Sequence, residues 1–568
     1  MFPQELVIIG VHSAKFPSEQ LTENIRQAVM RHGIEHPVVN DAGFKIWNAY
    51  AVRAWPTLVL IDPNGRIAGE TSGEILAEEF AENIREVIRD NADQIDRTPL
   101  DLIPEAQREP LSVLRYPSRL LVRDNTLFVA DTGHNRILEI HLDPDGLGGE
   151  VQRVFGSGRP ALLNGPAAEA AFHGPHGLGL KGSSTDGTLF VADTENHAVR
   201  AIDLTSGTVT TLAGTGQKGH GRMALGAPTE MPLRSPWAVL PLDQYLLIAM
   251  AGSHQIWVLL ADGRLGPFAG NGAEDLVDGP VAESSFNQPS DLAYGFGHLL
   301  VADPEASAVR AISLTETPQT MTLVGQGLFD FGDQDGPNGT ALLQHCVGLA
   351  AGEREIYVAD TYNHKIKRLD PTAGQIQTLI GTGQPGSRDG AFEEAHLFEP
   401  EGVQYAAGRL WIADTNNHRI RVADLAGRIV RTFLLRGIER LPVPESAAGR
   451  ETAQVLPAQQ AAVGRVRLVL DVRLPEGYKR NPDAPTIVVS GDGDRPERIV
   501  IPPDRPLAWD VDLHADAQLP VSLTLYYCQE QDAQLCLIHD RQMVIPLTVA
   551  PSGPKEIHVP VVVEAIQG

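Results

Sequence analysis

Two of the three cysteines in the chain, Cys528 and Cys536, flank the short stretch QEQDAQL between two apolar runs. A stretch of this kind joins neighbouring strands, and cysteines on neighbouring strands can form a disulfide when their Cβ atoms lie about 3.5–4.5 Å apart. The chemistry that such a pair offers is thiol–disulfide exchange, and the alternative is two half-buried thiols without a redox role. Cys346 stands alone where equivalent segments have proline, so we expect it to be a buried packing residue.

Histidines recur in five of the six copies of a turn that follows an apolar strand. The six copies are VADTGHNRI (129–137), VADTENHAVR (191–200), IAMAGSHQIW (248–257), VADPEASAVR (301–310), VADTYNHKIK (358–367) and IADTNNHRIR (412–421). Their histidines are His134, His197, His254, His364 and His418. Imidazole is a common metal ligand, but a symmetric repeat would spread these rings apart instead of clustering them around one ion. We therefore predict turn residues and no metal site, with Asn taking the positive φ that tight turns require.

The turn also defines a repeat, because successive copies lie 62, 57, 53, 57 and 54 residues apart. Gly-rich connections such as FAGNGAEDLVDGP and LIGTGQPGSRDGA lie between the copies, and no helix follows their G-x-G, which excludes a dinucleotide-binding turn. A period near fifty residues in a β-rich chain is typical of blades around a central channel. We predict a mainly β fold, a six-bladed β-propeller over 119–436.

A binding site in such a ring would lie at the channel mouth, where the innermost strands begin just after a recurring proline. The residues expected to point there are Arg119, His176, Trp237, Ser290, Val347 and Glu401, with His173, Asp291 and Glu399 beside them. They differ from blade to blade on a repeated frame, which is where specificity can reside. The alternative is that they only face solvent. They offer too few histidines and acids for a metal-dependent hydrolase or lyase, so we predict no catalytic residues and no cofactor.

Two further regions flank the repeat. Residues 1–95 alternate strands (5–13, 36–41) with helices (18–33, 74–95), which indicates an α/β layer fold. Residues 463–568 consist of six or seven short apolar strands, which predict a β-sandwich of immunoglobulin-like type. The proline-bearing stretches 96–118 and 437–462 are expected to be linkers.

Composition limits the kind of partner. The net charge of −26, with scattered bases, argues against nucleic acid and anionic membranes, which need a basic footprint. The chain has no run of 18 apolar residues that would span a bilayer. Three cysteines in 568 residues suit a reducing compartment, so we expect a cytoplasmic location.

The residues quoted above carry several resemblances. The ADT-x-NH turns look like NHL repeats. LVIIGVHSAKF (6–16) and the loop Trp55-Pro56-Thr57 resemble the later part of a thioredoxin-like domain, the loop matching that family's cis-proline. LPEGYKRNPDAPT (474–486) and the cysteine hairpin resemble the N-terminal domain of bacterial transmembrane thiol-disulfide reductases. In sum, the chain resembles the NHL-repeat-containing protein 2 family in a bacterial-type form.

One departure from the thioredoxin pattern bears on function. No cysteine precedes Cys346, so the C-x-x-C of a redox-active domain is missing. We expect this domain to be N-terminally incomplete with that motif upstream, and the alternative is a domain that has lost its redox chemistry. The resemblance implies a scaffold that binds a protein partner on the propeller face. The alternative is a thiol-disulfide redox protein that uses the upstream motif or the Cys528–Cys536 pair. The partner and the oligomeric state stay open.

Overall fold

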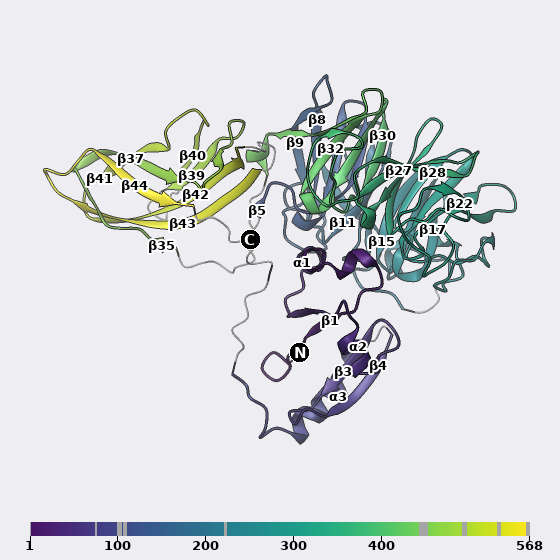
Figure 1. Cartoon of the computed structure of the whole chain (residues 1–568). Helices are drawn as coiled ribbons and strands as arrows, with labels where there is room; N and C mark the ends of the chain where they lie inside the picture. The colour runs from purple at the N-terminus through teal and green to yellow at the C-terminus, as the bar shows by residue number, and fades with distance from the viewer. Residues whose placement is uncertain are drawn as a thin grey trace. The chain divides into compact units, whose positions relative to one another are not determined.

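The computed structural model divides into two units, Met1–Glu109 and Pro110–Gly568 (Figure 1). The structure describes residues 2–73, 77–98, 105, 111–220, 224–441, 453–490, 497–530 and 536–563. Within these residues no helix combines the length and the apolar character needed to cross a bilayer.

The first unit is a small α/β arrangement, as predicted. Its elements are β1 (Gly10–His12), η1 (Pro17–Gln20), α1 (Thr22–Arg31), β2 (Val38–Asn40), α2 (Lys45–Ala49), β3 (Thr57–Ile61), β4 (Ile67–Ser72) and α3 (Ala77–Asp90). Strands β1 and β2 pair in parallel, and β3 and β4 form a separate antiparallel hairpin. The strand expected over 5–13 is limited to β1. Helix α2 begins where it does because the Asp41 carboxylate accepts the backbone N–H groups of Ile46 and Trp47, at 3.0 and 2.9 Å.

The second unit begins with six successive sheets of four or five strands, which we call the ring (Figure 1). The first sheet holds β6 (Pro117–Arg123), β7 (Thr126–Asp131), β8 (Arg136–Leu142), β9 (Gly148–Phe155) and, arriving from far along the chain, β34 (Leu434–Arg436). The second holds β10 (Gly165–Pro166), β11 (Pro175–Lys181), β12 (Thr188–Asp193), β13 (Ala198–Asp203) and β14 (Thr208–Ala213). The third holds β15 (Pro236–Leu242), β16 (Tyr245–Met250), β17 (Gln255–Leu259) and β18 (Leu265–Ala269).

The remaining three sheets repeat this plan. The fourth holds β19 (Gly279–Pro280), β20 (Asp291–Gly295), β21 (His298–Asp303), β22 (Ala308–Ser313) and β23 (Gln319–Val324). The fifth holds β24 (Gly336–Pro337), β25 (Cys346–Ala351), β26 (Ile356–Asp360), β27 (Lys365–Asp370) and β28 (Gln375–Ile380). The sixth holds β29 (Gly390–Ala391), β30 (Val403–Ala406), β31 (Arg409–Asp414), β32 (Arg419–Asp424) and β33 (Ile429–Thr432).

Short 3₁₀ turns connect the strands, namely η3 (Thr132–His134), η4 (Pro228–Glu230), η5 (Ala251–Ser253), η6 (Pro304–Ala306), η7 (Thr361–Asn363), η8 (Thr415–Asn417) and η9 (Ile438–Arg440). The innermost strands contact one another in the closed order β6, β11, β15, β20, β25, β30 and back to β6, so the fold is mainly β and propeller-like.

The C-terminal β region follows the ring and consists of two sheets. Its strands are β35 (Gln454–Val455), β36 (Gln459–Ala461), β37 (Gly464–Arg473), β38 (Tyr478–Arg480), β39 (Thr486–Ser490), β40 (Glu497–Ile501), β41 (Ala508–Leu513), β42 (Ala517–Gln529), β43 (Cys536–Val549) and β44 (Glu556–Val562). Strands β41, β37 and β44 form the smaller sheet. Alternate side chains of both sheets, including Leu468, Trp509, Leu523 and Ile545, fill one core.

The two stretches expected to be linkers contribute structure instead. Strand β5 (Leu111–Ser112) lies in 96–118 and pairs with β43, while β35 and β36 lie in 437–462 and pair with the same strand. Leu114 and Ile438 also join an apolar cluster that includes Tyr526 and Ile538 of the C-terminal β region. These strands escape a sequence reading because two- and three-residue strands next to prolines carry no periodicity.

A buried ion pair recurs inside the sheets. The aspartate that ends the second strand contacts a base on the third strand, as Asp193 contacts Arg200 at 2.8 Å. The other pairs are Asp131–Arg136, Asp303–Arg310, Asp360–Lys367 and Asp414–Arg421. The second aspartate oxygen accepts a backbone N–H from the segment before the innermost strand, as from His173 at 2.7 Å. In the second, fourth and sixth sheets the guanidinium also donates to carbonyls of the Gly-rich connection, as Arg200 does to Ala171 and Leu163.

The third sheet shows what happens when this pair is absent. Met250 stands in the place of the aspartate and Trp257 in the place of the base, since Trp257 faces Ile248 as Arg200 faces Val191. The Met250 sulfur still accepts the equivalent backbone N–H, from Arg234 at 3.4 Å. Both charges are therefore lost together, which avoids an unpaired buried charge.

We predict that Arg200→Met alone lowers the free energy of unfolding by about 3–5 kcal/mol, because Asp193 then remains buried and uncompensated. The double variant Asp193→Met/Arg200→Trp copies the third sheet and should recover most of that loss. Urea unfolding followed by circular dichroism measures both. A double variant as unstable as the single one would contradict this account.

Candidate functional site

The pairing of each innermost strand with the second strand of its sheet shows which of the expected mouth residues occupy equivalent positions. Arg119 pairs with Ala130, as Ala238 pairs with Ala249 and Gly348 with Ala359. Arg119 therefore lies one residue further along its strand than the other expected mouth residues, and Ser118 takes their position. The prediction of Arg119 as a member of this set was out of register, because Arg119 lies two residues after Pro117, whereas Trp237 directly follows the equivalent Pro236.

Arg119 and Asp291 occupy equivalent positions on the first and fourth sheets, and they meet in the middle of the ring. Arg119 Nε lies 3.5 Å from Asp291 Oδ1, and Arg119 Nη2 donates to the carbonyls of Ser290 and Val347, each at 2.9 Å. Burial raises the pKa of Asp291, while Arg119 opposes that shift. The ion pair therefore obstructs the channel.

Small residues at the equivalent positions make room for this pair. A Cβ on Gly348 would lie 2.0 Å from the Glu401 carbonyl oxygen, and one on Gly402 would lie 2.4 Å from that of Ser118. The innermost strands thus approach too closely for side chains there. Four of the residues that we expected to point to the channel mouth are buried instead, namely Arg119, Ser290, Val347 and Glu401, with Arg119 only 5% exposed.

His176 and Trp237 remain partly exposed at this end of the ring. Their rings stack with centroids 4.5 Å apart, and His176 Nδ1 lies 2.9 Å from the carbonyl oxygen of Gly174. Burial lowers the pKa of His176 although the nearby Glu401 carboxylate opposes the shift, which favours a neutral ring. Of the neighbours, His173 is exposed, whereas Glu399 is buried and accepts a hydrogen bond from Asn416 Nδ2 at 2.8 Å. These side chains form no group of three or more potential metal ligands among the described residues.

The recurring histidines hold successive sheets together, in keeping with their prediction as turn residues. His197, His254, His364 and His418 have φ of 46–55°, and the Nδ1 atom of each accepts a backbone N–H from the next sheet. Asn135 and Ser307 play the same part in the first and fourth sheets, accepting from Gly174 and His345.

The prediction that Asn takes the positive φ was right for Asn135 of the first copy but wrong for the copies that contain His197, His364 or His418, where the histidine takes it. In the complete copies the Asn side chain donates to the strand-ending aspartate, as Asn363 does to Asp360 at 2.8 Å. His134 takes that part in the first copy, with Nδ1 3.0 Å from Asp131 Oδ2. The order of the two residues in the motif could not reveal which side chain faces inward.

A disulfide joins Cys528 and Cys536, which lie directly opposite each other at the end of the β42–β43 ladder with Cα atoms 4.1 Å apart. Asn481 Nδ2 donates to Cys536 Sγ at 3.3 Å. Sequence reasoning proposed the pair but missed Asn481, because 47 residues separate it from Cys528 (528 − 481). Cys346 is fully buried, as expected for a packing residue.

The first unit carries the loop Trp55-Pro56-Thr57, and its Trp55–Pro56 bond is cis. Trp55 Nε1 donates to the Ser13 carbonyl at 2.8 Å, and Thr57 Oγ1 donates to that of Ala54. The loop borders a cavity of about 740 Å³ lined mainly by apolar side chains of β1, α2, β3 and the residues before β1. Several of these side chains are exposed, among them Val7 and Ile9.

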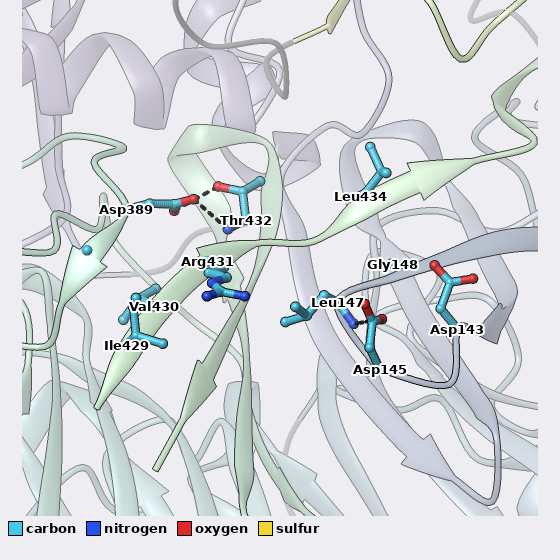
Figure 2. Close-up of a pocket in the computed structure, with 11 residues that line it drawn as sticks. Asp143, Asp145, Leu147, Gly148, Asp389, Ile429, Val430, Arg431, Thr432 and Leu434 are labelled. Carbon is cyan, nitrogen blue, oxygen red and sulfur yellow. Dashed lines mark hydrogen bonds between the residues drawn. The ribbon is translucent and has the colours of Figure 1, made fainter. Parts of the chain in front are cut away.

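A hollow of about 500 Å³ lies where the chain crosses from β33 to β34 (Figure 2). Asp389 accepts the Thr432 N–H and hydroxyl at 2.9 and 3.0 Å, and Asp145 accepts the Leu147 N–H. These polar groups fix the crossing segment and the β8–β9 turn. The hollow therefore lies where β34 crosses to the first sheet and pairs with β9. The sequence did not indicate this pairing.

Comparison with known proteins decides the family. A thioredoxin-like family model matches residues 2–67, and the NHL repeat model matches 399–423. NHL repeat-containing protein 2 of Bos taurus is 34% identical over 610 residues, covering 96% of this chain and 82% of that protein. The chain belongs to the NHL repeat-containing protein 2 family.

Two further comparisons involve a longer plant protein and a solved structure of low sequence identity. "Protein SUPPRESSOR OF QUENCHING 1, chloroplastic" of Arabidopsis thaliana is 34% identical over 581 residues, and the chain covers 54% of it, about half its length. Among solved structures, the nidogen/laminin complex aligns with a TM-score of 0.35 and 13% identity, over 56% of this chain and 93% of that one. Membership of the NHL repeat-containing protein 2 family confirms the resemblance seen in the sequence, together with its thioredoxin-like and NHL components.

The histidine contacts of this family member predict a pH effect on stability. Burial lowers the pKa of His364 to about 4, whereas an unfolded histidine titrates near 6.5. Between these values the unfolded chain binds the proton and the folded chain does not, so His364 destabilises the fold as the pH falls from about 6.5 towards 4, by about 2 kcal/mol between pH 7 and pH 5.

The matched variant is His364→Asn, since Asn135 makes the same contact in the first sheet without a titratable ring. We expect this variant to lose about 2 kcal/mol less than the wild type between pH 7 and pH 5 in urea unfolding. Equal losses in both proteins would show that His364 does not stay neutral when folded.

Proposed function

We propose that this family member is a non-enzymatic scaffold that holds a protein partner on the end of the ring where the innermost strands begin. One observation carries the proposal: the Arg119–Asp291 pair obstructs the middle of the ring beside the partly exposed His176–Trp237 stack. A ring obstructed in this way presents a surface instead of a tunnel. Tryptophan is the residue type most often found as an anchor in such surfaces.

The finer architecture belongs to the same proposal. We take the six sheets as the six blades of an NHL propeller over 119–436, because each has four antiparallel strands in sequence order. We take 463–568 as an immunoglobulin-like sandwich and 1–95 as the thioredoxin-like part. The two facing sheets β41–β37–β44 and β43–β42–β39–β40 support the sandwich.

The chemistry of the partner follows from charge. At a net charge of −26 the protein repels nucleic acid and anionic lipid, so we propose that the partner is a protein. The proposed binding role requires no cofactor. We place this interaction in the cytoplasm. The oligomeric state does not enter the proposal.

We predict that Trp237→Ala weakens partner capture about 30-fold, since loss of an aromatic anchor costs about 2 kcal/mol. The matched control is Tyr245→Ala, because Tyr245 is an exposed aromatic residue at the other end of the same β15–β16 hairpin. A photo-crosslinking amino acid at 237 and at 245 compares the two ends directly. Equal capture and crosslinking at both positions would remove binding from this end of the ring.

A second candidate function is thiol-disulfide exchange at Cys528 and Cys536, and the observed disulfide favours it. The thioredoxin-like unit contains no cysteine, so within this chain these two sulfurs are the groups that can exchange. A cytoplasmic dithiol reductant would cycle the pair between its two forms.

We predict that the pair equilibrates with glutathione buffers at a potential between about −300 and −180 mV, the range of exchangeable disulfides. Alkylation followed by mass spectrometry measures the oxidised fraction. A potential well below this range would mark a structural disulfide and remove the second candidate function.

A further inference from the structure

The two sulfurs of the disulfide have different surroundings. Cys528 is fully buried, because it lies on β42 between Lys479 of β38 on one side and Cys536 of β43 on the other. Cys536 begins β43 and is partly exposed. An external thiolate can therefore approach one sulfur and not the other.

Asn481 is a fixed hydrogen-bond donor for the accessible sulfur. The Asn481 backbone N–H donates to the Tyr526 carbonyl at 3.0 Å, and its Oδ1 accepts the Asp483 N–H at 2.8 Å. With its oxygen held in this way, the Asn481 amide directs Nδ2 at Cys536 Sγ. A donor to sulfur favours the thiolate over the thiol.

The ring completes the surroundings of Cys536. A cavity of about 60 Å³ is lined by Cys536, Asn481 and Asp483 and, from the sixth sheet, by His418 and Arg419. The titratable side chains that line it are thus Arg419, His418 and Asp483. His418 accepts the Tyr116 N–H through Nδ1, and buried Arg419 donates Nε–H to the Asn417 carbonyl. A cavity of this size holds a few water molecules at most, so a thiol must reach Cys536 from its solvent side.

We propose that Cys536 is the exchanging sulfur of this protein, that Asn481 is the positioning residue that stabilises its thiolate, and that Cys528 is the buried partner sulfur. The proposal deepens the second candidate function and rests on it. The co-reactant is an external dithiol.

The exchange balances in two steps. The thiolate of the dithiol attacks Cys536 Sγ, a mixed disulfide forms, and the bond to Cys528 breaks, so Cys528 leaves as a thiolate and takes a proton from water. The second thiolate of the dithiol then attacks the external sulfur of the mixed disulfide, and Cys536 leaves as a thiolate that accepts the Asn481 N–H. Two electrons pass from the dithiol, which becomes a disulfide, to the cysteine pair.

The first test maps the mixed disulfide. The full chain is treated briefly with reduced glutathione, quenched with acid and analysed by mass spectrometry. We expect glutathione on Cys536 at least ten times more often than on Cys528, with buried Cys346 unmodified as the internal control. Glutathione mainly on Cys528, or equally on both, would overturn the proposal.

The second test measures thiol pKa values in Cys528→Ser, which leaves Cys536 as a free thiol. Iodoacetamide rates are followed from pH 6 to pH 10. We expect an apparent pKa for Cys536 below the usual value of about 8.5, and an increase of about one unit in Cys528→Ser/Asn481→Leu. Leucine is similar in size and removes the donor to sulfur without adding a charge, so a merely structural Asn481 would leave the profile unchanged.

The two tests separate this proposal from the function on which it rests. If glutathione buffers never reduce the wild-type pair, the redox function fails, but the alkylation profile of Cys528→Ser still decides the role of Asn481. If Cys528→Ser does not fold, Asn481→Leu in the wild-type background is treated with glutathione. We then expect about tenfold slower release of Cys536 as thiolate, and an unchanged rate overturns the assignment.

Discussion

The aspartate at the end of the second strand is the residue on which five of the six sheets of the ring depend. Its carboxylate is fully buried in five of the six sheets, and it binds at once a base on the third strand and a backbone N–H before the first strand. Burial raises the pKa of Asp303 and of Asp360 to about 6. The nearby Arg310 and Lys367 lower these pKa values, so without them the shift would be larger. The base is therefore needed to keep the carboxylate charged near neutral pH. Where the base is Arg200, Arg310 or Arg421 it also donates to carbonyls of the Gly-rich connection, so one ion pair fixes three segments of the sheet.

Contacts between sheets use the residues that follow this aspartate. The Thr hydroxyl after it donates to the proline carbonyl that starts the next innermost strand, as Thr194 does to Pro236 at 2.7 Å. Thr415 donates in the same way to Pro117, and His418 accepts the N–H of Tyr116, so the sixth sheet is joined to the first by the contacts that join the others. A single local motif thus serves the interior of a sheet and its junction with the next. That double use explains why the motif recurs more fully than any other part of the chain.

The repeat, the mainly β fold and the pairing of Cys528 with Cys536 could be predicted from the sequence, because each depends on spacing along the chain. The Arg119–Asp291 pair could not, since it joins residues from the first and fourth sheets whose proximity depends on the closed ring. The contact of Asn481 with Cys536 was missed for a related reason. Asn481 lies just after β38, a strand too short to show periodicity, so nothing in the sequence placed it beside the β42–β43 hairpin. The orientation of Asn and His within the turn was also beyond a sequence reading, because either residue type can adopt a left-handed backbone.

Strand β34 has a consequence for how the protein is made. It belongs to the first sheet and lies parallel to β9, yet its residues are synthesised after all the other strands of the six sheets. A ribosome releases the chain from its N-terminus onward, so the first sheet emerges early with the outer edge of β9 uncovered. That edge stays open to pairing with another nascent chain until Leu434–Arg436 arrives. Slow translation within the sixth sheet would lengthen this interval, and crowded polysomes would be the place where two copies associate wrongly.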